Sequence, residues 1–267
     1  MVQADEIKNM TMLFQRFIYK GIPAPFRKEI WMRNCPSPGV PLSTHVPPST
    51  VEAIRIDISR TFSNNQYLRL ERFRNGLGRM LYTLAQYVPS VGYCQGINFV
   101  AALILLVIKD ESKATDLLIH MVRQRQDYYN DTMSGLRRDT RVLQVILAKE
   151  CPRVAAVLKV LDVGLDLLVG KWFLCWFAES FPLETVLRIW DCMIYDGNDL
   201  WLFRISLYLI RTSQHQIAKA KSMEQLIQFF QEIPRSRTAL YCHQLIKSAS
   251  LEHVTQKAID ELRSMHA

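Results

Sequence analysis

The segment LGRMLYTLAQYVPSVGYCQGINFVAALILLVI, residues 77–108, decides the fold class of this chain. Its first part repeats apolar side chains at intervals of three and four residues, the spacing of one face of an α-helix. The residues in that repeat are Leu77, Met80, Leu81, Leu84 and Val88. Its last part, residues 99–108, is a continuous apolar run that is too short to span a bilayer. We therefore expect two buried helices, joined by a polar turn that contains Tyr93, Gln95 and Gly96.

The same helical spacing recurs through the rest of the chain. It is found at Val186, Ile189, Trp190 and Met193, and again at Met223, Leu226, Ile227 and Phe230. The residues STVE, at 49–52, predict a capping box that opens another helix, and Gly197 after Asp196 predicts a helix end. Alternating strand patterns with hairpin turns are absent from the sequence. We therefore expect an all-α fold of many short helices, in which the proline-rich residues 34–49 form a loop.

Composition limits the class of protein. The chain has 267 residues, of which 49% are hydrophobic and 22% are charged, as in ordinary globular proteins. Its 33 basic and 25 acidic residues give a net charge of +8, which would suit an acidic partner, an anionic membrane or nucleic acid. Because acidic residues are interspersed among the arginines, as in RLERFRN and GLRRDTR, we expect a solvated basic face and no nucleic-acid binding.

Cysteine usage and the N-terminal residues predict the compartment. The six cysteines contain no CxxC pair and no histidine pair has the spacing of metal ligands, so we expect reduced thiols and no bound metal. Residues 1–14, MVQADEIKNMTMLF, lack the apolar core of a signal peptide. No segment is long and apolar enough for a transmembrane helix. We expect a soluble, cytoplasmic protein.

The stretch IRIDISRT, residues 54–61, offers the first candidate for chemistry. On a helix, Asp57 and Arg60 are three residues apart and lie on one face. They form either an ordinary surface ion pair, or a unit in which Asp57 orients Arg60 and leaves its guanidinium available to an anion. Arginine suits the second role because its charge is permanent and its forked shape matches phosphate oxygens.

Gln95, in YCQG, is the second candidate. Its amide has an acceptor oxygen and two donor hydrogens, so it can orient a water molecule and contact a phosphate together. Gly96 has no side chain and lets another backbone approach. The simpler interpretation is a glutamine at or near the first turn of a helix that bonds to local backbone. The P-loop motif of nucleotide-binding proteins and the GxSxG and HExxH motifs of hydrolases are absent from the sequence.

Taken together, five stretches resemble the TBC domain family, the GTPase-activating proteins of Rab-type small G proteins. GIPAPFRKEIW, at residues 21–31, resembles the family's opening element. Residues 54–61 resemble its IxxDxxR motif and residues 91–99 its YxQG motif. MSGLRRDTRVL at 133–143 and KWFLCWFAESFPLETVLRIWDCMIYDG at 171–197 resemble two later segments. The matching positions include Arg27, Trp31, Asp57, Arg60, Tyr93, Gln95, Gly96, Arg188, Trp190 and Asp191.

The resemblance implies an all-α, V-shaped TBC fold with two helical lobes. It implies that the chain accelerates GTP hydrolysis by a Rab GTPase in its GTP-bound state, and so acts in vesicle trafficking. Arg60 would be an arginine finger and Gln95 a glutamine finger, both entering the partner's nucleotide pocket in trans. The activator would not be an enzyme itself and would carry no cofactor, because GTP and Mg²⁺ belong to the partner. It would be cytoplasmic, either free or recruited peripherally to endomembranes.

The remaining matching residues would support the two fingers. Asp57 would fix Arg60, and Tyr93 and Gly96 belong to the same supporting group. Bulky aromatic side chains and paired charges suit a buried network that holds the finger helices. By this argument the supporting core consists of Arg27, Trp31, Arg188, Trp190 and Asp191.

The similarity extends over roughly residues 16–235. We therefore expect an N-terminal extension at residues 1–15 and one TBC domain at residues 16–267, with the family motifs between about residues 21 and 197.

The chain departs from the family at residues 63–65, where SNN replaces a proline that commonly follows the arginine finger. This change removes no reactive group. The alternative function is a non-catalytic Rab-binding effector or scaffold of the same fold. Retention of both Arg60 and Gln95 argues against that alternative.

Overall fold

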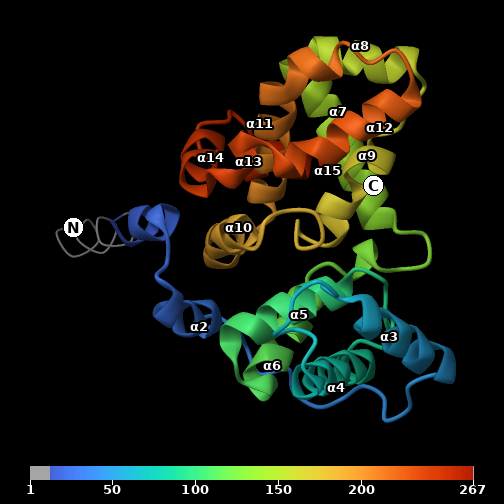
Figure 1. Ribbon diagram of the computed structural model, residues 1–267, viewed down its shortest axis with the longest axis vertical. Helices are drawn as coiled ribbons and strands as arrows, with labels where there is room; N and C mark the ends of the chain where they lie inside the picture. Colours follow the sequence, from blue (N-terminus) through green and yellow to red (C-terminus); the bar gives the residue numbers. More distant parts are fainter. Residues whose placement is uncertain (1–12, 267) are drawn as a thin grey trace. The chain divides into compact units, whose positions relative to one another are not determined.

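The computed structural model describes residues 13–266 of the chain, and these residues form helices, turns and loops without any strand (Figure 1). The predicted all-α fold class is therefore confirmed. Residues 1–12 of the expected N-terminal extension lie outside the described part, and residues 13–20 are helical. Among the described helices, none combines the length and the apolar character that crossing a membrane requires.

The helices group into two compact units. The described residues of the first unit are 13–27, 141–169 and 181–266, and those of the second unit are 28–140 and 170–180. Each unit therefore combines segments that are far apart in the sequence. Three helices have residues in both units, namely α2 (Ala24–Met32), α7 (Ser134–Glu150) and α9 (Leu165–Leu174).

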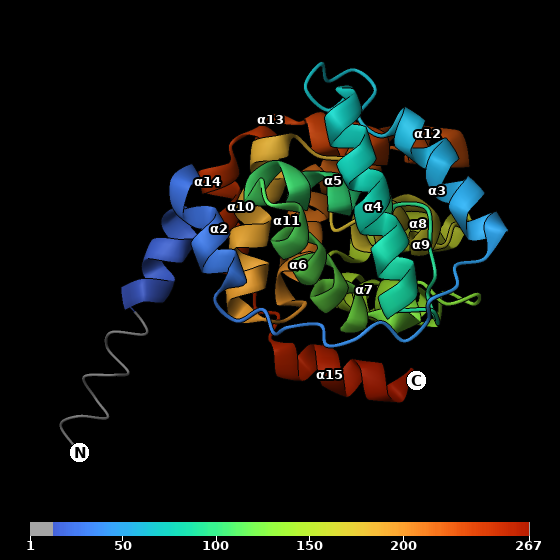
Figure 2. The same ribbon diagram turned by 90° about the horizontal axis from the view of Figure 1, so that it is seen from below.

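The second unit contains both helices expected within residues 77–108. Its elements are α3 (Pro48–Arg60), α4 (Glu71–Tyr87), α5 (Ile97–Ile108), α6 (Glu111–Arg123) and the 3-10 helix η1 (Gln126–Tyr128). Helix α4 packs against α3, α5 and α6, and α5 also packs against α6 (Figures 1 and 2). The five apolar side chains of the predicted repeat are at most 2% exposed. Their burial supplies much of the driving force for this packing.

The first unit is built around α11 (Leu200–Ile217), which packs against several neighbours and buries Trp201 and Phe203. The other elements of the unit are α8 (Pro152–Val160), α10 (Leu183–Asp196), α12 (Met223–Glu232), η2 (Ile233–Arg235), α13 (Arg237–Leu240), α14 (Cys242–Ala249) and α15 (Gln256–Met265). Helix α10 ends at Asp196 and is followed by Gly197, whose φ of +64° is left-handed. The predicted helix end is therefore confirmed.

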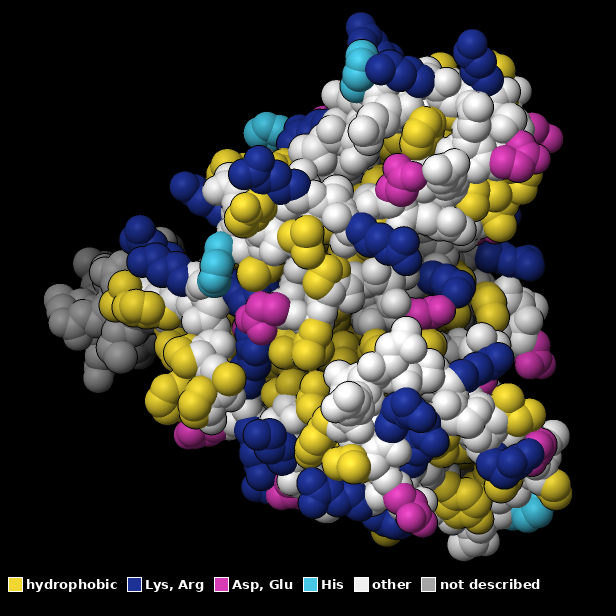
Figure 3. Space-filling view, in the orientation of Figure 1, with side chains coloured by type: hydrophobic (Ala, Val, Ile, Leu, Met, Phe, Trp, Pro, Cys, Tyr) yellow, Lys and Arg dark blue, Asp and Glu magenta, His cyan; other side chains and the backbone are white. Residues whose placement is uncertain are grey.

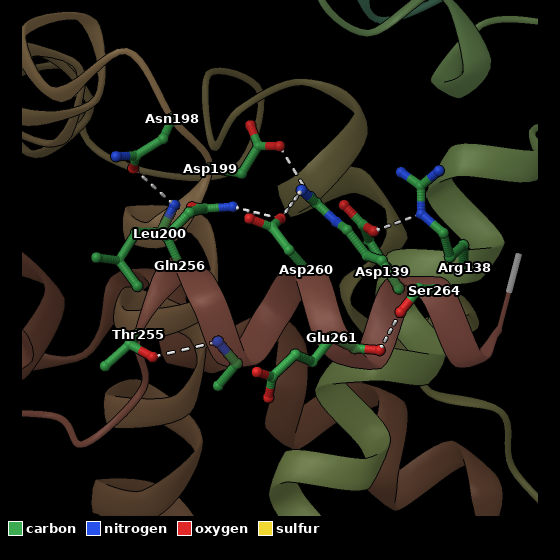
Figure 4. Close-up of polar contacts among 12 residues, drawn as sticks. Arg138, Asp139, Asn198, Asp199, Leu200, Thr255, Gln256, Asp260, Glu261 and Ser264 are labelled. Atoms are coloured by element: carbon green, nitrogen blue, oxygen red, sulfur yellow. Dashed lines mark hydrogen bonds and ion pairs between the residues drawn. The ribbon is translucent and has the colours of Figure 1, made fainter.

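Helix α15 is held by polar contacts at both of its ends (Figure 4). The Thr255 hydroxyl caps its first turn by accepting from the backbone N–H of Ala258 at 3.2 Å. Near the other end, Arg263 donates from Nη2 to Asp199 at 2.8 Å and from Nη1 to Asp260 at 3.5 Å. The contact with Asp199 ties α15 to the residue that precedes α11, whereas the other two contacts lie within the α15 segment.

The predicted capping box at residues 49–52 is wrong. Helix α3 begins two residues earlier than such a box implies, at Pro48, with Pro47 as its N-cap in place of Ser49 and no side-chain capping bond. Proline fits the first helical position because its φ is already helical and its missing N–H would have no partner there. The predicted loop at residues 34–49 accordingly ends at Pro47.

Basic side chains are dispersed over the molecular face that Figure 3 shows, with acidic and apolar side chains between them. Several arginines are paired: Arg55 lies 2.6 Å from Glu52, and Arg79 lies 2.6 Å from Glu111. This pattern agrees with the solvated basic face expected from the sequence.

Candidate functional site

Asp57 and Arg60 lie on one face of α3, close to its C-terminal end, and form an ion pair between Oδ1 and Nη2. The two partners differ in exposure, because the Asp57 side chain is 4% exposed and the Arg60 side chain is 53% exposed. An ordinary surface ion pair would expose both. The structure instead shows a buried carboxylate that holds one edge of a guanidinium whose remainder faces solvent.

Tyr93 holds the other oxygen of the same carboxylate. Its hydroxyl donates to Asp57 Oδ2 at 2.5 Å. Burial, followed by this hydrogen bond to an anion, raises the pKa of Tyr93 well above its ordinary value, so the phenol remains a donor. Asp57 therefore joins the helix that carries Arg60 to the turn that carries Gln95.

Gln95 lies immediately before Gly96, the N-cap of α5. The expectation that it lies at or near the first turn of this helix is confirmed. The simpler of the two interpretations, in which Gln95 bonds to local backbone, does not hold, because the Gln95 side chain is exposed and has no hydrogen-bond partner among the described residues. Its amide oxygen and amide hydrogens all remain available to an external group.

The turn at Gly96 requires glycine for two reasons. Its φ is +114°, which side-chain-bearing residues rarely adopt. A Cβ atom at this position would also lie 2.8 Å from Sγ of Cys175, which is closer than a carbon and a sulfur can approach. The buried thiol of Cys175 and the side chain of Leu174 thus form a wall directly behind the glutamine turn.

Cys94 completes this turn. It is partly buried, and burial followed by the nearby Asp57 carboxylate raises the pKa of its thiol. A protonated thiol is a weak nucleophile, so Cys94 is poorly suited to covalent chemistry.

Thr61 and Asn98 also belong to the site, although we did not predict them. Thr61 accepts a hydrogen bond from Asn98 Nδ2 at 2.8 Å, and Asn98 Oδ1 accepts from the backbone N–H of Gly96 at 2.9 Å. The available signal was that Asn98 is the only polar residue in the helix INFVAALILLVI. Buried amides need hydrogen-bond partners, so an asparagine in such a helix indicates a specific contact.

The other predicted supporting residues are buried, but they do not all lie in the same unit. Arg27, Arg188 and Asp191 form an ionic cluster in the first unit. Arg27 Nε lies 3.2 Å from Asp191 Oδ1, and Arg188 Nη1 lies 3.0 Å from Asp191 Oδ2. Trp190 is fully buried in the same unit, whereas Trp31 is buried in the second unit.

This ionic cluster ties α10 to the N-terminal segment of the first unit. Arg188 Nη2 donates to the carbonyl of Tyr19 at 2.7 Å, and Arg27 Nη2 contacts the exposed carboxylate of Glu184 at 2.9 Å. The structure therefore brings Asp57, Arg60, Tyr93, Gln95 and Gly96 together in the second unit. It places Arg27, Arg188, Trp190 and Asp191 in the first unit.

Within residues 13–266, no group of three or more His, Cys, Asp or Glu side chains could hold a metal ion. The polar groups that face solvent at this site are one guanidinium and one amide. Such groups bind and orient an external anion or water molecule, and neither transfers a proton readily near neutral pH.

Comparisons of the sequence with known proteins agree with one another. The family model described as the Rab-GTPase-TBC domain matches residues 27–218. The chain is 53% identical to growth hormone-regulated TBC protein 6 of Caenorhabditis elegans, over 94% of this chain and 77% of that protein. It is 34% identical to growth hormone-regulated TBC protein 1 of Homo sapiens, over 86% of this chain and 72% of that protein.

Solved structures show the same fold. The flagellar RabGAP TBC domain of Chlamydomonas superposes with a TM-score of 0.75 at 23% identity, covering 91% of this chain and 84% of that one. The Ypt/Rab-GAP domain of Gyp1p superposes with a TM-score of 0.74 at 19% identity, covering 96% and 93%. The implied TBC fold is therefore confirmed.

Proposed function

The chain belongs to the Rab-GTPase-TBC domain family, whose members activate Rab GTPases, and we propose that it accelerates GTP hydrolysis by a Rab partner through two residues supplied in trans. The observation that supports this proposal is that one unit exposes two polar side chains, one of them held by a buried carboxylate and the other without a hydrogen-bond partner among the described residues. Arg60 is exposed but held by the buried carboxylate of Asp57, and Gln95 is exposed with its amide unused. Both are exposed, and the segments that carry them are joined by buried hydrogen bonds.

Arg60 is the proposed arginine finger. Phosphoryl transfer spreads negative charge over the transferred group, so a permanent positive charge at that group stabilises the transition state. An arginine supplied in this way raises the rate by about 10³–10⁵, which corresponds to about 4–7 kcal/mol. Asp57 restricts the guanidinium to one orientation before the partner docks, which lowers the entropic cost of placing it.

Gln95 is the proposed glutamine finger. An amide can accept a hydrogen bond from the attacking water while it donates one to a phosphate oxygen. This geometry aligns the water for in-line attack, a task that many G proteins perform with their own glutamine. The left-handed turn at Gly96 and the wall formed by Cys175 would keep the amide directed outward.

The proposed activator contributes no cofactor. GTP and Mg²⁺ would be carried by the partner, and the chain alone would perform no chemistry at Arg60 or Gln95. We also propose that it acts in the cytoplasm on Rab proteins of vesicle trafficking, either free or recruited peripherally to endomembranes.

The test is single-turnover phosphate release from a panel of GTP-loaded Rab proteins. The wild-type chain should accelerate at least one Rab, Arg60→Ala should abolish most of that acceleration, and Gln95→Ala should reduce it strongly. Arg55→Ala is the matched control, because Arg55 is an exposed, ion-paired arginine on the same helix.

Two results would contradict the proposal. Full activity of both Arg60→Ala and Gln95→Ala on a responsive Rab would show that neither residue is a finger. Stoichiometric binding to GTP-loaded Rab proteins without faster phosphate release across the panel would favour the effector or scaffold function.

A further inference from the structure

A buried hydrogen-bonded bridge connects the two segments that carry Arg60 and Gln95. The Thr61 hydroxyl donates to the carbonyl of Asp57 at 2.6 Å and accepts from Asn98 Nδ2 at 2.8 Å. Asn98 Oδ1 then accepts from the N–H of Gly96 at 2.9 Å. Thr61 and Asn98 are 3% and 1% exposed, so water does not compete for these bonds.

The two ends of this bridge adjoin the proposed fingers directly. Thr61 follows Arg60 and caps the C-terminus of α3, and Gly96 follows Gln95 and caps the N-terminus of α5. We propose that Thr61 and Asn98 are positioning residues that set the glutamine finger relative to the arginine finger. This inference rests on the proposed Rab-activating function.

The chemistry of Asn98 exceeds what α5 needs for itself. Satisfying the Gly96 N–H at the start of the helix requires only an acceptor, which serine, threonine or aspartate also supplies. Asn98 has in addition an amide donor, and that donor is directed to Thr61 on the other segment. A buried polar group is costly unless it is bonded, so the second bond indicates a selected link between the segments.

Contacts on either side reinforce the bridge. Tyr93 and Asp57 form an outer link between the same two segments. The next residues along each segment, Phe62 and Phe99, pack edge to face with ring centroids 5.1 Å apart and an interplanar angle of 83°. Phe62 adopts a φ of +45°, a conformation that a non-glycine residue keeps only when its surroundings require it. The Thr61–Asn98 bridge therefore lies between two further contacts in one clamp.

The experiment compares Thr61→Val, which has the same shape without the hydroxyl, with Thr61→Ser, which keeps the hydroxyl. Misplacing a catalytic group by about 1 Å can cost about 100-fold in rate, so we expect Thr61→Val to lower kcat by about 10-fold to 100-fold. KM for the Rab should change by less than about 3-fold, because the exposed docking surface is unaltered, and Thr61→Ser should recover most of the rate. Asn98→Ala should behave like Thr61→Val.

Thr140→Val is the matched control for stability. Thr140 is a buried threonine of the same unit, and its hydroxyl donates to the carbonyl of Leu136 at 2.9 Å. Thr140→Val should lower Tm about as much as Thr61→Val does and leave kcat unchanged. If Thr61→Val also lowers Tm but leaves kcat unchanged, the bridge is only structural and the inference is overturned.

A double-mutant cycle tests whether the bridge acts through Gln95. If it positions Gln95, Thr61→Val should cause little further loss of rate in a Gln95→Ala background. If the fold-losses of rate caused by Thr61→Val and Gln95→Ala instead multiply in the double variant, the two substitutions act independently. That result would overturn the inference and leave the proposed function intact. The proposed function itself fails by a different result, namely full activity of Arg60→Ala and Gln95→Ala.

Discussion

The hydroxyl of Tyr93 donates to Asp57 Oδ2 at 2.5 Å, and the other oxygen of that carboxylate pairs with Arg60. One buried anion thus orders both an arginine on α3 and the turn that leads to Gln95. Removing either partner leaves the carboxylate with half of its contacts in a site from which water is largely excluded.

Tyr93→Phe should therefore reduce both stability and activation of the Rab. The lost hydrogen bond to a buried charge should lower the free energy of unfolding by about 1–3 kcal/mol. Tyr128→Phe provides the control, because the Tyr128 hydroxyl also donates to a buried carboxylate of the same unit, that of Asp139. We expect comparable losses of Tm for both variants, and slower GTP hydrolysis at saturating activator only for Tyr93→Phe. Equal activity of the two variants would refute a role for Tyr93 in finger placement.

Gly96→Ala should destabilise the chain and displace the glutamine turn. The left-handed φ costs a non-glycine residue about 1–3 kcal/mol, and the added Cβ meets Sγ of Cys175. Adding Cys175→Ala to Gly96→Ala should recover the part of the loss that comes from the clash. Gly170→Ala is the control, because a Cβ there would meet no atom within 4 Å and alanine favours a helix. Urea denaturation of the wild type and these three variants measures the differences, and an unchanged midpoint for Gly96→Ala would contradict this prediction.

Asp191→Asn should be strongly destabilising. The buried Asp191 carboxylate lies between the guanidinium groups of Arg27 and Arg188, so its neutralisation removes the anionic partner of Arg188 and leaves Arg27 paired only with the exposed Glu184. Breaking a buried ion pair in this way costs about 3–5 kcal/mol. Glu184→Gln removes a partner of Arg27 that is 62% exposed and should cost only about 0–1 kcal/mol. Similar losses for the two variants in chemical denaturation would show that the buried cluster is not a major source of stability.

Asp110 should make a pH-dependent contribution to stability. Its carboxylate accepts from the backbone N–H of Lys113 at the start of α6, and this bond, aided by the nearby Lys28, lowers the pKa of Asp110 in the folded chain. Because the pKa of Asp110 is lower in the folded chain, its full stabilisation is present at pH values above its pKa in the unfolded chain, which is about 4. This stabilisation is lost as the pH falls through the pKa of the folded chain.

The difference in unfolding free energy between wild type and Asp110→Ala should therefore be about 1 kcal/mol at pH 7 and should shrink below about pH 4. Asp110→Asn keeps a side chain that can cap the helix but carries no charge. The difference in unfolding free energy between Asp110→Asn and Asp110→Ala should therefore not depend on pH. A wild-type advantage that stays constant down to about pH 2 would rule out this assignment.

The sequence predicted those features that depend on local spacing. The apolar repeat and the apolar run in residues 77–108 became α4 and α5, and the three-residue interval placed Asp57 and Arg60 on one face of α3. Helical periodicity decides such features because each residue's neighbours on the face are fixed by its position in the chain.

Features that depend on distant partners could not be predicted from spacing. The hydrogen bond between Tyr93 and Asp57 joins residues 36 positions apart, and the contact between Thr61 and Asn98 joins residues 37 positions apart. The capping box at residues 49–52 failed for a local reason, because Pro47 and Pro48 start the helix without a side-chain cap. The family motifs indicated the proposed functional residues, and the structure shows the contacts that hold them.

The most direct test of the central claim uses a responsive Rab whose own catalytic glutamine is replaced by alanine. If Gln95 aligns the attacking water, the wild-type chain should still accelerate GTP hydrolysis by this Rab in a single-turnover assay, and Gln95→Ala should not. If the wild-type chain accelerates the unaltered Rab but has no effect on the altered one, the water is aligned by the partner and Gln95 is not a glutamine finger.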